Sequence, residues 1–290
     1  MPDLGGIFPA IITPFDERGR LDLGELDAFL DFQRAAGVDG FCATGTNGEG
    51  TSLSVQERKD VLDAMLAHAG GLPVIAGTGA CSLADALELT QYAGRAGAAA
   101  VLVLPSFFFP QATARGLAEY FLRVLDASTV PVFLYNIPQF SRVPITDDTL
   151  ALIADHPNLS GIKDSAGDWD RSRQLLARKD ISMYCGEDTL LARFAAAGAL
   201  GCISGVCNAL PELIVAVWRA RHCPEELERE QERLNAACRV FVQYPIVGNS
   251  KAILAHRGVI HTHARPPLVD LDAGQAHGLI AGLRDLGILT

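Results

Sequence analysis

The chain has 290 residues, of which 49% are hydrophobic, and a net charge of −10. This length and apolar content suit one large α/β domain, and no run of about 18 apolar residues predicts a membrane span. Because the charge is negative and no basic cluster is present, nucleic acid and anionic membranes are not expected as partners.

Short apolar, β-branched runs alternate with longer amphipathic segments along the chain. The apolar runs predict strands at residues 7–12, 40–43, 74–77, 100–104, 132–135, 160–163, 183–185 and 201–203. The amphipathic segments predict helices at residues 22–36, 54–69, 82–96, 113–126, 146–154, 169–177, 189–197 and 212–221. Nearly uniformly apolar strands, each followed by a helix, indicate a parallel sheet covered by helices. Eight such units in roughly 220 residues predict a (β/α)8 TIM barrel, and no strand is followed by the Gly-x-Gly-x-x-Gly of a dinucleotide-binding fold.

We assign residues 1–222 to this barrel and residues 223–290 to a C-terminal helical appendix. Helical patterns recur in the appendix, and Arg265-Pro-Pro-Leu is predicted as a connecting turn. These helices are predicted at residues 225–242, 250–256 and 272–286. No low-complexity linker separates the two parts, so we expect the appendix to pack on the barrel rather than to form an independent domain.

The cysteines and histidines show no pattern typical of a metal site. The seven cysteines contain no Cys-x-x-Cys pair and no Cys/His ligand spacing, as in reduced thiols of a cytoplasmic protein. His261 and His263 stand two residues apart with no third ligand nearby, too few for a metal site. The first residues, Met-Pro-Asp-Leu-Gly-Gly, lack the basic and apolar regions of a secretory signal. We therefore expect a cytoplasmic protein that uses neither metal nor cofactor.

Lys163 ends the predicted strand 160–163, at the edge where barrel enzymes place their active sites. Burial there makes a charged amine costly, so we expect the pKa of Lys163 to fall. The neutral amine is then suited to Schiff-base formation with a carbonyl compound. Gly186 and Ile203, at two other strand ends, would supply the apolar wall that keeps the amine neutral. The alternative is a lysine that pairs with Asp164 or reaches solvent.

Two further strand ends carry groups suited to carbonyl chemistry. The loop 45–50 can turn its backbone N–H groups inward as a nest for a carboxylate, helped by Thr46 and Asn47. Tyr135 offers a phenol that can donate and accept a proton near the amine. An ordinary tight turn and a tyrosine bonded to the backbone are the alternatives. Glu49 is either catalytic or a partner for backbone N–H groups.

Seven short motifs follow one another along the chain: Gly45-Thr-Asn-Gly-Glu, Ala76-Gly-Thr-Gly, Tyr135-Asn-Ile-Pro, Gly161-Ile-Lys-Asp, Gly186-Glu-Asp, Gly201-Cys-Ile-Ser and Pro245-Ile-Val with Lys251. With them the sequence resembles, over nearly its whole length, the pyruvate-dependent class I lyases typified by dihydrodipicolinate synthase and N-acetylneuraminate lyase. The resemblance implies a Schiff base between Lys163 and an α-keto acid, usually pyruvate or one that yields it, with Tyr135 relaying protons. It also implies that Thr46 and Asn47 bind the carboxylate of the keto acid. Thr46 is then a catalytic residue together with Lys163 and Tyr135. A homotetramer, built as a dimer of dimers, is implied as well.

Two substrate-binding positions depart from the pattern of dihydrodipicolinate synthases. Phe107 stands where those enzymes have a second tyrosine, reached from the neighbouring subunit. Phe140 stands near the position of an arginine that binds the carboxylate of the aldehyde substrate. A phenylalanine has neither the proton nor the charge. Arg142, two residues further on, is a candidate substitute, although such a shift rarely preserves a bidentate geometry.

The sequence therefore predicts a class I aldolase or lyase that acts on a 2-keto acid and releases or condenses pyruvate. We expect its substrate to be a 2-keto-3-deoxy sugar acid or 4-hydroxy-2-oxoglutarate, with specificity set by the loops 107–111, 140–143 and 205–208. The alternatives are a 2-keto-3-deoxy acid dehydratase, then dihydrodipicolinate synthase itself, or a non-catalytic regulator that binds a keto acid.

Overall fold

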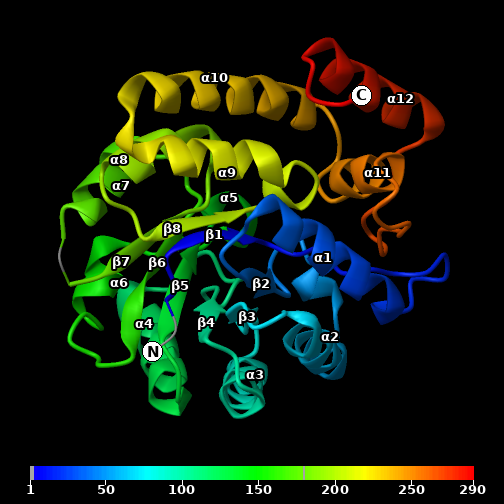
Figure 1. Ribbon diagram of the computed structural model, residues 1–290. Coiled ribbons are helices and arrows are strands. Elements are labelled where there is room, and N and C mark those ends of the chain that lie inside the picture. Colours follow the sequence, from blue (N-terminus) through cyan, green and yellow to red (C-terminus); the bar gives the residue numbers. More distant parts are fainter. Residues whose placement is uncertain (1–2, 179) are drawn as a thin grey trace.

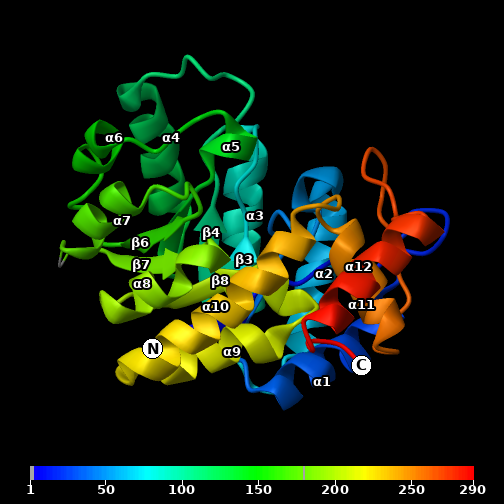
Figure 2. The ribbon, with the colours of Figure 1, turned by 90° about the horizontal axis from the view of Figure 1, so that it is seen from above.

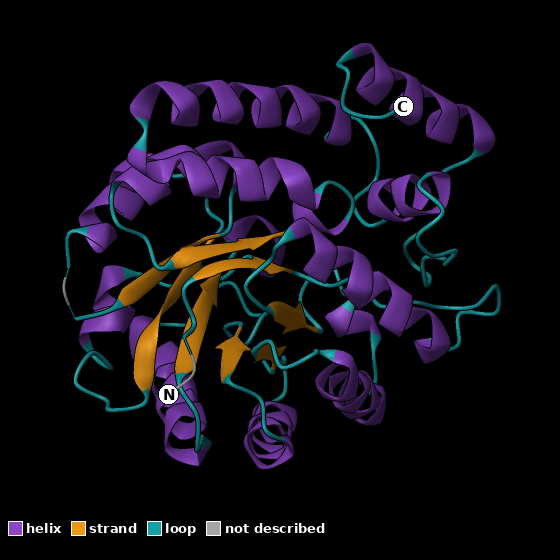
Figure 3. Ribbon diagram, in the orientation of Figure 1, coloured by secondary structure: helices purple, strands orange, loops and turns teal. Residues whose placement is uncertain are grey.

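Eight parallel strands form the centre of the computed structural model, which describes residues 3–178 and 180–290, and helices surround them (Figure 1, Figure 3). The strands are β1 (Gly6–Pro9), β2 (Phe41–Ala43), β3 (Val74–Gly77), β4 (Ala100–Val103), β5 (Val132–Asn136), β6 (Leu159–Asp164), β7 (Ser182–Cys185) and β8 (Gly201–Ser204). They hydrogen-bond in the order β1-β8-β7-β6-β5-β4-β3-β2. The ring closes after β1, where Ala10 bridges Cys42 and the Ile11 N–H donates to the Cys42 carbonyl at 2.9 Å. The predicted (β/α)8 TIM barrel is confirmed.

Five strands end at residues other than those expected: β4, β5, β6 and β8 differ by one residue and β1 by three. β1 stops at Pro9 instead of residue 12. Ala10 and Ile11 still bond to β8 and β2, and the chain leaves the sheet at Ile12, whose N–H donates to the Asn208 side chain at 3.0 Å. β6 continues one residue beyond Lys163, so that Asp164 also lies within the strand. Lys163 is therefore the penultimate residue of its strand rather than the last.

The outer layer consists of helices that follow the strands. They are α1 (Leu26–Ala36), α2 (Val55–His68), α3 (Leu83–Ala96), α4 (Ala114–Ala127), α5 (Pro138–Ser141), α6 (Asp147–Ala151), α7 (Trp169–Leu176), α8 (Leu191–Ala196) and α9 (Pro211–Arg219). The expected helix 146–154 is shorter, since α6 ends at Ala151. The short helix α5 was not predicted; Pro138 starts it, at the position where a missing N–H costs nothing.

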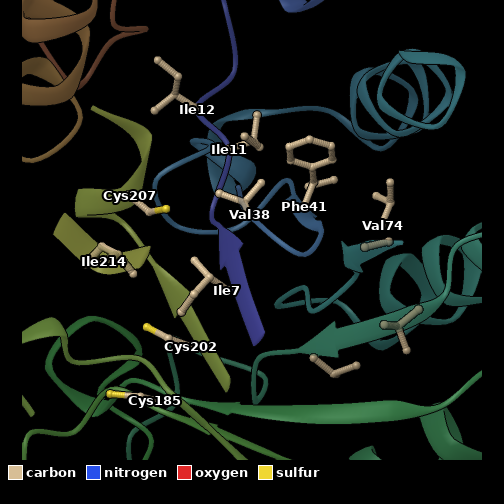
Figure 4. Packing of buried hydrophobic residues seen from close by; sticks show 14 of the residues in the cluster. Ile7, Ile11, Ile12, Val38, Phe41, Val74, Cys185, Cys202, Cys207 and Ile214 are labelled. Carbon is tan, nitrogen blue, oxygen red and sulfur yellow. The ribbon is translucent and has the colours of Figure 1, made fainter. Parts of the chain in front are cut away.

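The barrel has an inner and an outer core, because successive strand residues face opposite sides. Inward-facing side chains such as Phe8, Phe133 and Tyr184 fill the barrel. Outward-facing ones form the larger core against the helices, part of which Figure 4 shows. There, Cys185 and Cys202 lie on neighbouring strands. All seven cysteines lie within the described residues and are free thiols, as expected.

The C-terminal segment adds α10 (Pro224–Phe241), α11 (Gly248–His256) and α12 (Ala273–Asp285), which lie on one side of the barrel (Figure 1, Figure 2). α10 runs beside α9. Buried residues of all three helices, among them Leu234, Ile253 and Leu283, belong to the same hydrophobic core as the barrel. The division of the chain into a barrel of residues 1–222 and an appendix of residues 223–290 stays a prediction. Within the described residues, no helix is both long and apolar enough to span a membrane.

Candidate active site

Tyr135 and Lys163 are directly paired on β5 and β6, and both side chains point into the barrel. Each is 4% exposed. The Lys163 Nζ lies 4.1 Å from the centre of the Tyr135 ring. Thr46 Oγ1 lies 3.4 Å from the Tyr135 hydroxyl. The structure thus brings the three expected catalytic residues into one chain of contacts.

The pKa of the Lys163 amine does not follow the expected direction. Burial lowers it, but Tyr135 and Cys42 raise it, and the balance lies above the ordinary value. Burial in turn raises the pKa of the Cys42 thiol to about 11. The expectation of a depressed lysine pKa is therefore wrong, because it counted desolvation and left out the neighbours inside the barrel. The amine must therefore lose its proton before it can attack a carbonyl group.

Asp164 does not pair with Lys163. It faces the outer side of β6, where its carboxylate accepts hydrogen bonds from Asn136 Nδ2 at 2.8 Å and from Ser172 Oγ at 2.7 Å. Asn136 follows Tyr135 on β5 and is paired with Asp164 in register. Its own amide oxygen accepts from the Ile145 N–H at 3.0 Å. A side-chain hydrogen bond therefore joins the outer faces of β5 and β6 directly behind Tyr135 and Lys163.

Lys163 lies in a cavity of about 400 Å³, which we call the lysine cavity. The expected site residues that line it are Thr46, Asn47, Tyr135, Phe140, Lys163, Gly186 and Ile203. Phe107 does not reach it. Phe107 lines a neighbouring cavity of about 250 Å³, the side cavity, which shares Thr46, Tyr135 and Phe140 with the first.

Two glycines make room for side chains of the lysine cavity. A Cβ at Gly186 would lie 2.8 Å from Lys163 Cε and 2.1 Å from Ser165 Oγ. A Cβ at Gly205 would lie 2.6 Å from Asn47 Nδ2. All three distances are shorter than real Cβ contacts, so any other residue at Gly186 or Gly205 would displace these side chains. Gly186 therefore serves as a space for the lysine side chain more than as an apolar wall.

Sequence reasoning missed several residues that line the lysine cavity. Glu187, Asp188 and Thr189 follow β7, and their strand-end position was a usable signal. Burial raises the pKa of Asp188 to about 6, against hydrogen bonds from Ser204 and from the Val206 N–H that lower it. The appendix contributes Phe241, Val242, Tyr244, Ile246 and Asn249. The motif Pro245-Ile-Val with Lys251 falls in this segment, but nothing in its pattern indicated a contact with the barrel's strand ends.

Charge is unevenly distributed around the site. Among the described residues that line the lysine cavity, Lys163 is the only basic one, and Glu187 and Asp188 are acidic. Arg142 is exposed, and it lines neither the lysine cavity nor the side cavity. The structure therefore gives Arg142 no contact with the site through which it would replace a carboxylate-binding arginine.

Glu49 and the histidine pair lie outside both cavities. Glu49 Oε2 accepts from the Arg265 N–H at 2.9 Å and Oε1 from Lys251 Nζ at 2.6 Å, which is a structural rather than a catalytic arrangement. The rings of His261 and His263 pack edge to face with centres 5.5 Å apart. Over residues 3–178 and 180–290, no three His, Cys, Asp or Glu side chains are grouped as metal ligands.

The sequence of the chain is similar to a known protein family and to individual proteins. Residues 3–284 match the family model described as the Dihydrodipicolinate synthetase family. The chain is 39% identical to an uncharacterized DapA-like lyase of Chloroflexus aurantiacus over 242 residues, or 81% of each protein. It is 32% identical to the 4-hydroxy-tetrahydrodipicolinate synthase of Mesorhizobium japonicum over 293 residues, or 99% of this chain and 100% of the relative.

Solved structures share the fold over the whole chain. One is YagE, a prophage protein of the dihydrodipicolinic acid synthase family from E. coli K12 in complex with pyruvate. It superimposes with a TM-score of 0.93 at 28% identity, covering 98% of this chain and 99% of that one.

Proposed function

The chain belongs to the dihydrodipicolinate synthetase family, and from that premise we propose that it is a class I lyase which cleaves a 2-keto-3-deoxy sugar acid to pyruvate and an aldehyde. The observation that carries the proposal is the Lys163 amine beside the Tyr135 phenol in a cavity lined by Thr46 and Asn47. The pyruvate complex of the prophage protein supports pyruvate as the keto acid.

The geometry suits a Schiff-base reaction. Lys163, after losing its proton to solvent, attacks the C2 carbonyl of the keto acid and forms a carbinolamine. Tyr135 gives its phenolic proton to the carbinolamine hydroxyl, which leaves as water, so that an iminium ion and a Tyr135 phenolate remain. Tyr135 then takes the proton of the C4 hydroxyl while the C3–C4 bond breaks. The bonding electrons enter the iminium group, so the aldehyde leaves and an enamine of pyruvate stays on the lysine. A proton returns to C3, and water hydrolyses the imine to free pyruvate and Lys163.

Thr46 and Asn47 would hold the carboxylate of the keto acid during these steps. Both line the lysine cavity, and Thr46 lies within hydrogen-bonding distance of Tyr135. A carboxylate bound at this loop leaves the C2 carbonyl facing Lys163. Fixing the carbonyl against the amine is what turns a bimolecular attack into an intramolecular one.

The second half of the substrate is best described as neutral and hydroxylated. Once Lys163 is bound in the imine, the described lining of the lysine cavity offers no cation for a second carboxylate. Its polar groups include Ser165, Thr189 and Asn249, which can hydrogen-bond hydroxyl groups. This favours a 2-keto-3-deoxy sugar acid over 4-hydroxy-2-oxoglutarate, which carries a second carboxylate. Phe140 and Phe107 also disfavour the synthase reaction with aspartate semialdehyde.

One observation supports dehydration as a second candidate. The pKa of Asp188 is raised to about 6, so a fraction of its carboxyl groups keep their proton at neutral pH. Such a group in the lysine cavity can protonate a hydroxyl that leaves as water. The same imine at Lys163 would then serve a dehydratase, whose product has lost water and yields no aldehyde.

The proposal is tested by pyruvate release from a panel of 2-keto acids, with Lys163→Ala as control. We expect turnover of a 2-keto-3-deoxy acid, and pyruvate with borohydride should label Lys163 covalently. For condensation with pyruvate, kcat/KM toward aspartate semialdehyde should be at least roughly a hundredfold lower than toward a neutral aldehyde. A faster semialdehyde reaction would reverse this ranking. Keto-acid binding without any turnover would indicate a regulator.

We also propose that the protein is a homotetramer. Three aromatic side chains are exposed beside the site, with Phe108 77%, Phe109 55% and Phe140 57% exposed. Apolar surface of this kind is typical of subunit contacts. Light scattering should give four times the chain mass of 30.9 kDa, and Phe108→Ser with Phe109→Ser should lower it. A wild-type mass of one chain would contradict the proposal.

A further inference from the structure

A buried ion pair connects the loop 45–50 with the C-terminal appendix. Lys251 Nζ donates to Glu49 Oε1 at 2.6 Å, and the two side chains are 2% and 0% exposed. The residues are 202 positions apart in the sequence. Lys251 also donates to the carbonyl oxygens of Thr13 and His263. The three hydrogens of the ammonium group therefore have three acceptors, which is the condition under which a buried charge is tolerated.

Glu49 fixes the shape of the loop that carries Thr46 and Asn47. Its backbone has a φ of 52°, in the left-handed region that residues other than glycine seldom adopt. Its N–H donates to the Thr46 carbonyl at 3.1 Å and closes the turn. Such a conformation persists only where the surroundings enforce it. The bonds to Lys251 and to the Arg265 N–H occupy both carboxylate oxygens and supply that constraint.

Arg265 holds the residues that follow the loop. Its guanidinium donates to the Ser52 carbonyl at 3.0 Å and to both carboxylate oxygens of Glu57, at 2.7 and 3.0 Å. The Arg265 guanidinium and the Lys251 ammonium also lie over the ring of Phe15, at 4.2 and 4.8 Å from its centre. Lys251 and Arg265 of the appendix thus bind the stretch from Glu49 to the first turn of α2.

We propose that Glu49 and Lys251 are positioning residues for the carboxylate of the keto acid. Neither lines the lysine cavity, so they act through the backbone that presents Thr46 and Asn47. The appendix, which follows the complete barrel, is in this view a part of the substrate site. The inference rests on the proposed function, because it requires a keto acid bound beside Lys163.

The test compares two ketones of similar size that differ in the carboxylate. Borohydride trapping on Lys163 is followed over a range of concentrations of pyruvate and of acetone, in wild type, Glu49→Gln and Lys251→Met. In both variants the pyruvate concentration for half-maximal trapping should rise on the order of tenfold or more, since small displacements of a binding group cost that much. Trapping with acetone should change by less than about twofold, because acetone has no carboxylate to misplace.

The matched control is Glu212→Gln. It makes the same chemical change in another ion pair between the barrel and the appendix, in which Arg257 Nη1 lies 2.9 Å from Glu212 Oε1, away from the loop. It should leave pyruvate trapping at the wild-type level. Should Glu49→Gln or Lys251→Met fail to fold, the double variant, which buries no unpaired charge, and Lys251→Arg carry the test, each with a raised pyruvate requirement.

Three outcomes would overturn the inference. Unchanged pyruvate trapping together with a lower melting temperature would show that the pair only stabilises the fold. An equal loss with pyruvate and acetone would show that it supports Lys163 itself rather than the carboxylate loop. If wild type is not labelled by pyruvate at all, no keto-acid site exists, so the proposed function fails and the inference that rests on it fails with it.

Discussion

At the scale of single residues, the face that each side chain takes on its strand decides its role. Lys163 and Asp164 are neighbours in sequence, yet one points to Tyr135 inside the barrel and the other to Asn136 and Ser172 outside. The acid that looked like a partner for the lysine is therefore no part of its electrostatics. The pKa of Lys163 depends instead on burial, Tyr135 and Cys42.

The raised pKa of Lys163 leads to a prediction for pH dependence. Below that pKa the neutral amine increases about tenfold per pH unit, so the rate of pyruvate trapping should rise steadily from neutral pH into the alkaline range. Tyr135→Phe removes a group that raises the pKa, and burial then lowers it. The trapping profile should therefore shift to lower pH. Turnover should nevertheless fall by roughly a hundredfold or more, because the proton relay is lost.

Cyanoborohydride trapping across the pH range measures the shift, and Tyr184→Phe is the matched control. Tyr184 is also buried inside the barrel, but its hydroxyl donates to the Leu4 carbonyl. Removal of the Tyr184 hydroxyl should leave the pH dependence of pyruvate trapping unchanged. A Tyr135→Phe profile that stays in place or moves to higher pH would contradict the assignment.

At the scale of elements, β5 and β6 hold the reactive pair through their register. Tyr135 faces Lys163, and Asn136 faces Asp164, so one hydrogen bond on the outer side fixes the alignment on the inner side. A slip of one residue would exchange the inner and outer faces of a strand. The buried Asn136–Asp164 bond therefore connects fold stability with the geometry of the site.

Asn136→Ala should lower both stability and turnover. It leaves the buried Asp164 carboxylate without one donor and the Ile145 N–H without its acceptor, at a cost of about 1–3 kcal/mol in the free energy of unfolding. Ser172→Ala is the control, because it removes another donor to Asp164 without touching β5. Denaturant unfolding and turnover should show that Asn136→Ala loses the more activity. Equal losses of activity would mean that the bond does not act through the register.

At the scale of the whole molecule, the appendix and the barrel form one hydrophobic core and share polar contacts. The loop after α11 binds the N-terminal turn at Gly19 and the start of α2 at Glu57 through Arg265. The hydrogen bond from Arg265 lowers the pKa of Glu57 from 4.5 to about 2. The pair therefore makes the attachment of the appendix dependent on pH.

The lowered pKa sets the sign of that dependence. Stability from Glu57 is complete above its ordinary pKa of 4.5 and is lost as pH falls toward about 2. Glu57→Gln should therefore lower the denaturant midpoint of unfolding at neutral pH. The difference between its midpoint and that of wild type should become smaller as the pH is lowered from 4.5 to about 3.5. Glu88→Gln breaks a more exposed ion pair with Lys59 and should change the unfolding midpoint little, both at neutral pH and at low pH. A Glu57→Gln difference that is constant with pH would contradict the linkage.

The sequence alone determined the barrel and the position of its chemistry. Apolar strands alternating with helices leave few arrangements other than a closed parallel sheet, and such a sheet gathers its strand ends at one edge, so Lys163, Tyr135, Thr46 and Asn47 could be grouped in advance. Tertiary structure alone decided the direction of the Lys163 pKa, the cavity that Phe107 lines and the contact between Glu49 and Lys251. The reason is physical. A local pattern reports which way a side chain faces within its own element, whereas the distance between residues 202 positions apart depends on how all the intervening elements pack.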